Sequence, residues 1–202
     1  MSQQHWENVY ENKTPEQMSW TQDEYATSLK LIQSLNADKN SKIIDVGGGD
    51  GSFVQSLLDL GFQDITVLNI SEAAIENAKT RLGDEASKIK WIVSDITKFQ
   101  PNETYDIWHD RATFHFLTEK KDIQTYVDLL ENNLNGNLVI GTFSTDGPLK
   151  CSGLDITQYS ESSMENLLQN NFEKIECFTQ DHKTPFDTTQ NFLFCNFKKI
   201  NS

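Results

Sequence analysis

The chain has 202 residues, with 17 Lys plus Arg against 30 Asp plus Glu and a formal net charge of -13. The length suits one hydrophobic core, and no long Pro/Ser/Gly-rich stretch divides it, so we expect a single domain over 1–202. The acidic balance disfavours a nucleic-acid partner, because phosphates would meet a repulsive field. No apolar run approaches the roughly 20 residues of a membrane helix, and the polar start lacks a signal-peptide core. We therefore expect a cytoplasmic protein, without a membrane partner, and a monomer.

The first 40 residues precede the repeating pattern of the chain. An amphipathic helix is predicted over 23–35, after a segment rich in aromatic residues that spans 5–20. Two interpretations stay open for the aromatic side chains, as a lid over a ligand or as anchors for the helix. These side chains are Trp6, Tyr10 and Trp20. We expect 1–40 to form a lid segment with a leading helix, and 41–202 to form the core.

Apolar runs alternate with helical patterns after residue 40, which is typical of βα units on a parallel sheet. The predicted strands are 42–46, 64–70, 88–95, 105–111 and 136–144. The predicted helices of this part are 52–61, 71–83, 120–134 and 160–171. Two further runs of alternating apolar residues, 172–182 and 189–200, predict an antiparallel hairpin that closes the sheet.

The three cysteines are widely spaced and include no CxxC pair, so we expect reduced thiols and no metal site. One alternative stays open, in which Cys151 and Cys195 line a pocket for a soft metalloid or a thiol. Against it, Cys195 lies in an alternating strand, where cysteine often behaves as a small buried hydrophobe.

The stretch IIDVGGGDG, residues 43–51, carries the clearest motif. A buried strand that ends in a Gly-rich turn and feeds a helix presents backbone N–H groups to a ligand, and glycine permits both positive φ and close approach. The spacing is an acid followed by GxGxG. The dinucleotide fingerprint GxGxxG fails at Ser52, and no GK[ST] follows, which excludes a P-loop. The turn predicts a nucleotide-like cofactor.

Together with this turn, the strand end TVLNIS, the segment VSDI and the C-terminal hairpin resemble the class I S-adenosylmethionine-dependent methyltransferases, over roughly residues 5–199. The resemblance implies an α/β, Rossmann-like fold. Its sheet would have seven mostly parallel strands, with an antiparallel last strand and helices on both faces. It also implies methyl transfer from S-adenosylmethionine to a small-molecule or protein side-chain acceptor, with S-adenosylhomocysteine as the product.

The resemblance further implies the cofactor contacts. The glycines of the turn would line the methionine and ribose parts, and Asp45 would lie near the amino group. Asp95 would accept from the adenine amino group, while Ile96 would pack on the ring. The full set expected to bind the cofactor is Trp20, Asp45, Gly47, Gly48, Gly49, Gly51, Asn69, Ile70, Asp95, Ile96 and Asp110.

Asn69 departs from the family, which usually has Asp or Glu there to accept from both ribose hydroxyls. An amide offers one acceptor oxygen and an NH2 donor, so one ribose contact is weakened or reversed. This departure motivates an alternative function, a catalytically silent cofactor-binding protein that works through a partner. A third hypothesis, a nicotinamide-dependent oxidoreductase, is disfavoured by the GxGxG spacing.

The acceptor side is expected near the segment IWHDRATFHFL. We expect Asp110, at the end of a strand, and His115 to be catalytic residues. For His115, which lies between Phe114 and Phe116, a packing role stays open as the alternative. His109 is expected to turn towards a covering helix, and Arg111 to pair with surface acids.

Two narrower resemblances concern the acceptor. The segments DRATFHFL, GTFSTDGP and NFLFCNF look like those of small bacterial-type methyltransferases whose acceptors are largely unassigned. The start HWENVY…MSW and Asp-Arg-Ala-Thr at 110–113 are partly similar to lysine methyltransferases of translation elongation factor. An acidic rim would suit a lysine from a basic protein.

Overall fold

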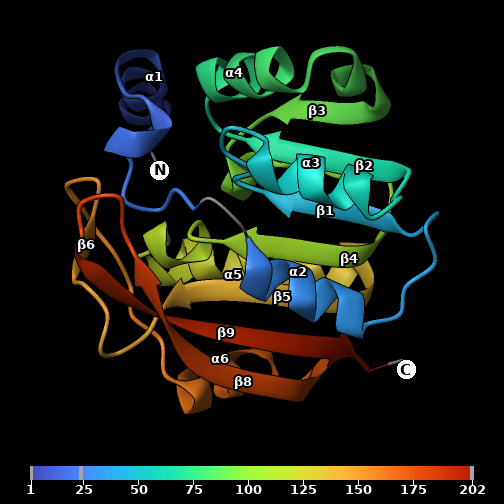
Figure 1. Cartoon of the computed structure of the whole chain (residues 1–202). Helices are drawn as coiled ribbons and strands as arrows, with labels where there is room; N and C mark the ends of the chain where they lie inside the picture. The colour runs from blue at the N-terminus through green and yellow to red at the C-terminus, as the bar shows by residue number, and fades with distance from the viewer. Residues whose placement is uncertain (1, 23–24, 201–202) are drawn as a thin grey trace.

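The computed structural model describes residues 2–22 and 25–200. Its main feature is a seven-stranded sheet in the order β3-β2-β1-β4-β5-β9-β8 (Figure 1). These strands are β1 (Lys42–Val46), β2 (Asp64–Asn69), β3 (Ile89–Val93), β4 (Tyr105–Arg111), β5 (Leu134–Phe143), β8 (Phe172–Lys183) and β9 (Thr189–Lys199).

The pairing of these strands confirms the predicted class. β1 pairs in parallel with β2 and with β4, and the same direction holds for β2 with β3 and β4 with β5. β9 is antiparallel to both of its neighbours, β5 and β8. The protein therefore has a Rossmann-like class I fold, in which the carboxyl ends of the parallel strands meet at one edge.

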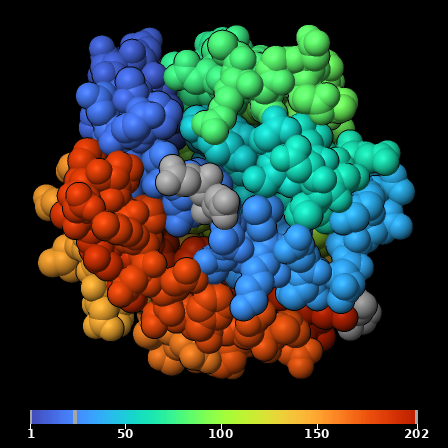
Figure 2. All heavy atoms as spheres, in the orientation of Figure 1, coloured from blue at the N-terminus to red at the C-terminus, as the bar shows by residue number. Residues whose placement is uncertain are grey.

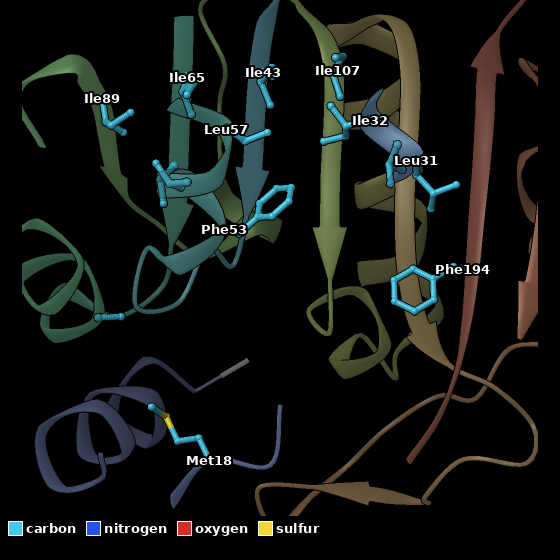
Figure 3. Close-up of a cluster of buried hydrophobic side chains, with 14 of the residues drawn as sticks. Met18, Leu31, Ile32, Ile43, Phe53, Leu57, Ile65, Ile89, Ile107 and Phe194 are labelled. Atoms are coloured by element: carbon cyan, nitrogen blue, oxygen red, sulfur yellow. The ribbon is translucent and has the colours of Figure 1, made fainter. Parts of the chain in front are cut away.

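Helices cover both faces of the sheet. One buried cluster lies under α2, α3 and α4, and the other lies under α5 and α6. Figure 3 shows the first cluster, where Ile43, Ile65, Ile89 and Ile107 stand side by side on adjacent strands and Leu57 of α3 points towards them. The helices are α2 (Ala26–Ser34), α3 (Ser52–Asp59), α4 (Glu72–Leu82), α5 (Lys120–Asn133) and α6 (Glu161–Leu168).

The aromatic-rich start of the chain forms a helix, α1 (Gln3–Asn12), that the sequence reasoning missed. Trp6, Val9 and Tyr10 are its buried residues, at the i, i+3, i+4 spacing of one helical face. Figure 2 shows this N-terminal part packed beside α4 and the β8–β9 hairpin. This spacing can be read from the sequence, but a segment of ten residues with low mean hydropathy also resembles a loop, so the helix was not predicted.

Most other boundaries agree with the predictions within two residues. Of the helix predicted over 23–35, α2 covers Ala26–Ser34, and residues 23 and 24 lie outside the described part. β5 begins at Leu134, because that residue pairs with Tyr105 across an irregularity in the ladder. The short elements are η1 (Pro15–Gln17), η2 (Gly83–Lys88), η3 (Ile96–Lys98), η4 (Phe114–Phe116), β6 (Lys150–Cys151) and β7 (Leu154–Asp155).

One prediction about the cysteines was wrong. Cys177 and Cys195 lie opposite each other in the β8–β9 hairpin and form a disulfide bond, with their Cα atoms 4.2 Å apart. No local pattern predicts this bond, because the two residues are separated by 18 positions and their pairing depends on the hairpin register. Cys151 is a buried free thiol.

None of the helices in the described part combines the length and the apolar character that crossing a lipid bilayer requires.

Candidate active site

The glycine turn connects β1 to α3. Gly47, Gly49 and Gly51 all have positive φ, at 73°, 56° and 79°. Gly48 is needed for space instead, because a Cβ there would lie 2.6 Å from Oδ2 of Asp45. At Gly51 a Cβ would lie 2.9 Å from that of Ala78. Gly51 thus allows α4 to pack closely, and it does not line the pockets described next.

A pocket opens at the carboxyl ends of β1, β2 and β4, and we call it the main pocket. About 570 Å³ of space not filled by atoms lies in it, counting the part that is open to solvent. It is lined by Trp6, Tyr10, Trp20, Val46, Gly47, Leu68, Asn69, Ile70, Ser94, Ile96, Arg111, Ala112, Thr113 and Phe116.

A second pocket, the side pocket, shares Trp20, Gly47 and Arg111 with the main pocket and continues along the glycine turn. It is lined by Met18, Trp20, Thr21, Tyr25, Asp45, Gly47, Gly48, Gly49, Asp50, Phe53, His109 and Arg111. The two pockets together form a cleft between the strand ends and the N-terminal segment.

Asp45 lies at the base of the side pocket, only 2% exposed. Its Oδ1 is 2.7 Å from Nδ1 of His109, and Nε2 of His109 is 2.9 Å from the hydroxyl of Ser28 on α2. His109 also stacks on Phe53, with ring centroids 4.0 Å apart. This confirms that His109 turns towards a covering helix. Oδ2 of Asp45 is buried and has no hydrogen-bond partner among the described residues.

Asn69 ends β2 and lines the main pocket, 4% exposed. Its Oδ1 accepts a hydrogen bond of 2.9 Å from the backbone N–H of Ser71. Tyr10 of α1 lines the same pocket as Asn69, and its ring centroid lies 6.4 Å from that of Trp20. The N-terminal helix therefore reaches the end of β2.

Glu7 fastens α1 to the start of α4. Its carboxylate accepts from the backbone N–H groups of Glu72 and Ala73, at 2.6 and 3.0 Å, and from the hydroxyl of Ser71 at 2.9 Å. Burial raises the pKa of Glu7, but these hydrogen bonds together bring it below its ordinary value. Glu7 was not singled out from the sequence, because its partners lie more than 60 positions away.

The segment after β3 contributes unequally to the site. Ser94 and Ile96 line the main pocket, as does Ile70 after β2. Asp95 is not among the lining residues. Its Oδ1 accepts hydrogen bonds from the backbone N–H and the hydroxyl of Thr97, at 3.0 and 2.9 Å, and so caps η3.

Asp110 lies away from both pockets, contrary to its expected role. It is fully buried on the α5 side of the sheet, where Oδ2 accepts a hydrogen bond of 2.7 Å from the hydroxyl of Tyr126. Oδ1 accepts from the backbone N–H groups of Thr113 and Phe114. Burial raises the pKa of Asp110 to about 6. Asp110 faces away from the pockets because successive residues of a strand face opposite sides of the sheet. Its hydrogen bonds to Thr113 and Phe114 organise the turn after β4.

His115 is also buried and lines neither pocket. Its ring stacks on Phe143, and its Nδ1 accepts a long hydrogen bond of 3.4 Å from the backbone N–H of that residue. Burial, and then the nearby Arg111, lower the pKa of His115 to about 3, so the imidazole is neutral.

The sequence suggested that Arg111 pairs with surface acids, but no acid among the described residues forms an ion pair with it. It is 7% exposed, lies on the same face of β4 as His109, and lines both pockets. Its NH1 donates to the backbone oxygen of Trp20 at 2.9 Å.

The idea of a thiol-rich pocket was wrong, because Cys195 is in the disulfide. Burial raises the pKa of Cys151 to about 11, which keeps its thiol protonated. Across the described ranges, no three His, Cys, Asp or Glu side chains converge as metal ligands would.

The cleft thus brings together Trp20, Asp45, Gly47, Gly48, Gly49, Asn69, Ile70 and Ile96 of the expected set, and leaves out Gly51, Asp95 and Asp110. The residues present fit S-adenosylmethionine. The unpaired carboxylate oxygen of Asp45 suits an ammonium, the three glycines 47–49 leave the backbone uncovered by side chains, and the apolar part next to Asn69 suits an adenosine.

The family described as "Methyltransferase domain" matches residues 43–137. Among curated proteins, malonyl-[acyl-carrier protein] O-methyltransferase 2 of Ilyobacter polytropus is 32% identical over 137 residues, covering 62% of this chain and 51% of that protein. The eEF1A lysine and N-terminal methyltransferase of Mus musculus is 26% identical over 126 residues, covering 60% of this chain and 18% of that protein. The chain therefore spans about half or less of the length of these two relatives.

Among solved structures, N-methyltransferase NodS from Bradyrhizobium japonicum, in complex with S-adenosyl-L-homocysteine, superposes with a TM-score of 0.71. The match is 19% identical and covers 96% of this chain and 93% of that one. At this identity the likeness concerns the fold alone. With the sheet order, the glycine turn and the family match, it leads to one identification. Residues 43–137 match the methyltransferase domain family, and the fold around them is that of the class I S-adenosylmethionine-dependent methyltransferases.

Proposed function

We propose that this protein is an active S-adenosylmethionine-dependent methyltransferase, folded as a single domain over 1–202 and working in the cytoplasm. The single observation that carries the proposal is the buried, unpaired Oδ2 of Asp45 beside the glycine turn. A carboxylate oxygen left in this state is unfavourable unless a ligand supplies a donor. The ammonium of the cofactor's methionine part is such a donor.

The residues that would hold the cofactor divide along the cleft. Asp45 and the turn from Gly47 to Gly49 would hold the methionine part. Asn69 would donate its amide N–H to one ribose oxygen, because its own oxygen is engaged by Ser71. Ile70 and Ile96 would pack on the adenine. When bound, the cofactor supplies a methyl group on a sulfonium, whose thioether leaves without protonation.

Asp110 and His115 take a different role from the one expected of them. Neither lines the cleft, so we propose that they position the turn after β4, which carries Thr113 and Phe116 into the main pocket. Catalysis would then rest mainly on alignment of the acceptor with the methyl group.

The acceptor is a small molecule or a protein side chain. The names of two relatives point in opposite directions, one to the acid of a malonyl group on a carrier protein and one to a lysine. A catalytically silent cofactor-binding protein stays the alternative. It is motivated by Asn69, which replaces a carboxylate that would accept from both ribose hydroxyls.

Methyl transfer can be tested with S-adenosylmethionine that carries a tritiated methyl group. The purified protein is incubated with several cell lysates, and small molecules are then separated from protein. The proposal predicts label in one of the two fractions, above the level given by a Gly49→Val variant. If the label stays with the cofactor in every lysate although the cofactor binds, the silent alternative replaces the enzyme.

A further inference from the structure

Arg111 is a buried cation that forms no ion pair with a carboxylate of the described residues. Only one of its guanidinium nitrogens is engaged, by the backbone oxygen of Trp20, while Nε and NH2 have no hydrogen-bond partner among the described residues. No carboxylate forms an ion pair with it in that part of the chain, from which Asp23 and Glu24 are excluded. A guanidinium held in this way is unfavourable unless a ligand completes the pair.

The surroundings of Arg111 hold the guanidinium in place without neutralising it. Its central carbon lies 4.9 Å from the ring centre of Phe192 and 5.6 Å from that of Tyr25. Such contacts with aromatic faces orient a cation, but they are weaker than a bidentate pair with a carboxylate. Burial lowers the pKa of Arg111 to about 10, which still leaves it charged at neutral pH.

The main pocket has no other charged side chain among its described lining residues. The lining also includes Trp6, Trp20, Ala112 and Phe116, which are apolar or aromatic. Trp6 and Phe116 meet edge to face, with ring centroids 5.0 Å apart. An occupant that matches this lining has an apolar body and one anionic group.

We propose that the methyl acceptor is an apolar carboxylic acid whose carboxylate pairs with Nε and NH2 of Arg111. This inference rests on the proposed function, since it names the acceptor class of the same cleft. The planar guanidinium offers two parallel N–H groups, which match the two oxygens of a carboxylate.

The same geometry disfavours a lysine acceptor. In the main pocket, the sulfonium of the cofactor and the guanidinium of Arg111 would place two positive charges, while the carboxylates of Asp45 and Asp50 line the side pocket. A lysine ammonium in the main pocket would add a third positive charge at low dielectric. The overall acidic charge of the protein acts at its surface and does not remove this local repulsion. The acidic surface therefore favours a lysine acceptor less strongly than Arg111 inside the pocket disfavours it.

The test uses matched pairs of small probes with the protein saturated by S-adenosylhomocysteine. Benzoate, phenylacetate and octanoate are titrated against the corresponding amides, and binding is measured by calorimetry. At least one acid should bind at least tenfold more tightly than its amide, and Arg111→Gln should abolish that preference. Lys88→Gln, which removes a positive charge at the surface, should behave as the wild type. The inference is overturned if no acid is preferred, or if Arg111→Gln keeps the preference.

The methionine part of the cofactor also has a carboxylate, which could be the partner of Arg111 in place of the acceptor. A second experiment distinguishes the two carboxylates. S-adenosylhomocysteine and 5′-methylthioadenosine, which lacks the amino-acid part, are titrated into the wild type and Arg111→Gln. The inference predicts that each compound binds both proteins within threefold. A loss of tenfold or more for S-adenosylhomocysteine alone would assign Arg111 to the cofactor and overturn the acceptor role. No binding of either compound to the wild type would instead refute the proposed function.

A last arm separates binding from a structural role. Arg111→Met removes a buried charge but keeps an apolar stem of similar length, so its thermal unfolding midpoint without ligand should equal or exceed that of the wild type. A fall of more than about 5 °C would show that Arg111 mainly clamps the segment at Trp20, and would contradict the inference.

Discussion

Nδ1 of His109 lies 2.7 Å from Oδ1 of Asp45, and the other carboxylate oxygen of Asp45, a residue that lines the side pocket, has no hydrogen-bond partner among the described residues. The imidazole is fixed in turn by Ser28 and by stacking on Phe53. Three elements therefore orient one carboxylate towards the place where the cofactor's ammonium would lie.

Asp45→Asn should weaken the binding of S-adenosylhomocysteine about tenfold, because a charge-assisted hydrogen bond becomes a neutral one. It should leave the affinity for 5′-methylthioadenosine unchanged, since that compound has no ammonium. Calorimetric titration of both compounds checks the prediction. An equal loss for the two would mean that the variant disturbs the turn rather than removing a specific contact.

Glu7→Gln should loosen α1 from α4 at neutral pH. The carboxylate caps the N-terminus of α4, where negative charge is favourable by about 0.3 to 1 kcal/mol, and its hydrogen bonds are charge-assisted. Hydrogen exchange of the α1 amides should therefore be several-fold faster in the variant. Glu11→Gln, an exposed site on the same helix, serves as the control and should match the wild type.

The pH dependence of this contact has a definite sign. Because the pKa of Glu7 in the folded protein is below its ordinary value of 4.5, its stabilising effect is complete above that value and is lost as the pH falls through the folded pKa. The difference between wild type and Glu7→Gln should thus shrink in acid. If the difference in exchange rate between the two proteins stayed constant down to pH 3, the stabilising role of the Glu7 carboxylate at the start of α4 would be contradicted.

The effect of Asp110 on the free energy of unfolding should depend on pH in the opposite direction to that of Glu7. Its pKa is raised by burial from 3.8 to about 6, so the folded protein binds more protons than the unfolded chain between these values. The free energy of unfolding should therefore fall as the pH rises from about 4 to about 6, relative to an Asp110→Asn variant. Urea unfolding at several pH values measures this difference. A flat difference would place the folded pKa near its ordinary value.

Most elements follow from the sequence because apolar periodicity and the glycine turn are local signals, and the seven-stranded sheet with its antiparallel last strand follows from the family resemblance. The site depends on contacts that are not local. Asp45 meets His109 only through the register between β1 and β4, and Glu7 meets Ser71 across 64 positions. Asp110 was expected in the site and Arg111 at the surface, whereas Arg111 lines the cleft and Asp110 is buried on the other face of the sheet. A pattern of strand residues does not say which face the pocket is on.

Reduction of the Cys177–Cys195 disulfide should lower the free energy of unfolding by about 3 kcal/mol, the amount expected for a closed loop of 18 residues. Urea unfolding with and without dithiothreitol measures the change, and a Cys177→Ala, Cys195→Ala variant should show no response. Two reactive thiols at these positions in the native protein before reduction would contradict the bond.

The glycine turn gives the most direct measurement of the central claim, which is that the backbone after β1 holds the cofactor. Gly49 lines the side pocket, and a Cβ there would lie 3.5 Å from the Tyr10 hydroxyl. Gly61, at the end of α3, also has a positive φ, but a Cβ there would have no atom closer than 4.0 Å. Alanine at either site should cost about 1 kcal/mol of stability.

S-adenosylhomocysteine is titrated calorimetrically into the wild type, Gly49→Ala and Gly61→Ala. The wild type and Gly61→Ala should bind one equivalent with equal affinity, while Gly49→Ala should bind at least tenfold more weakly. No heat with the wild type, or equal affinity in all three proteins, would contradict the account.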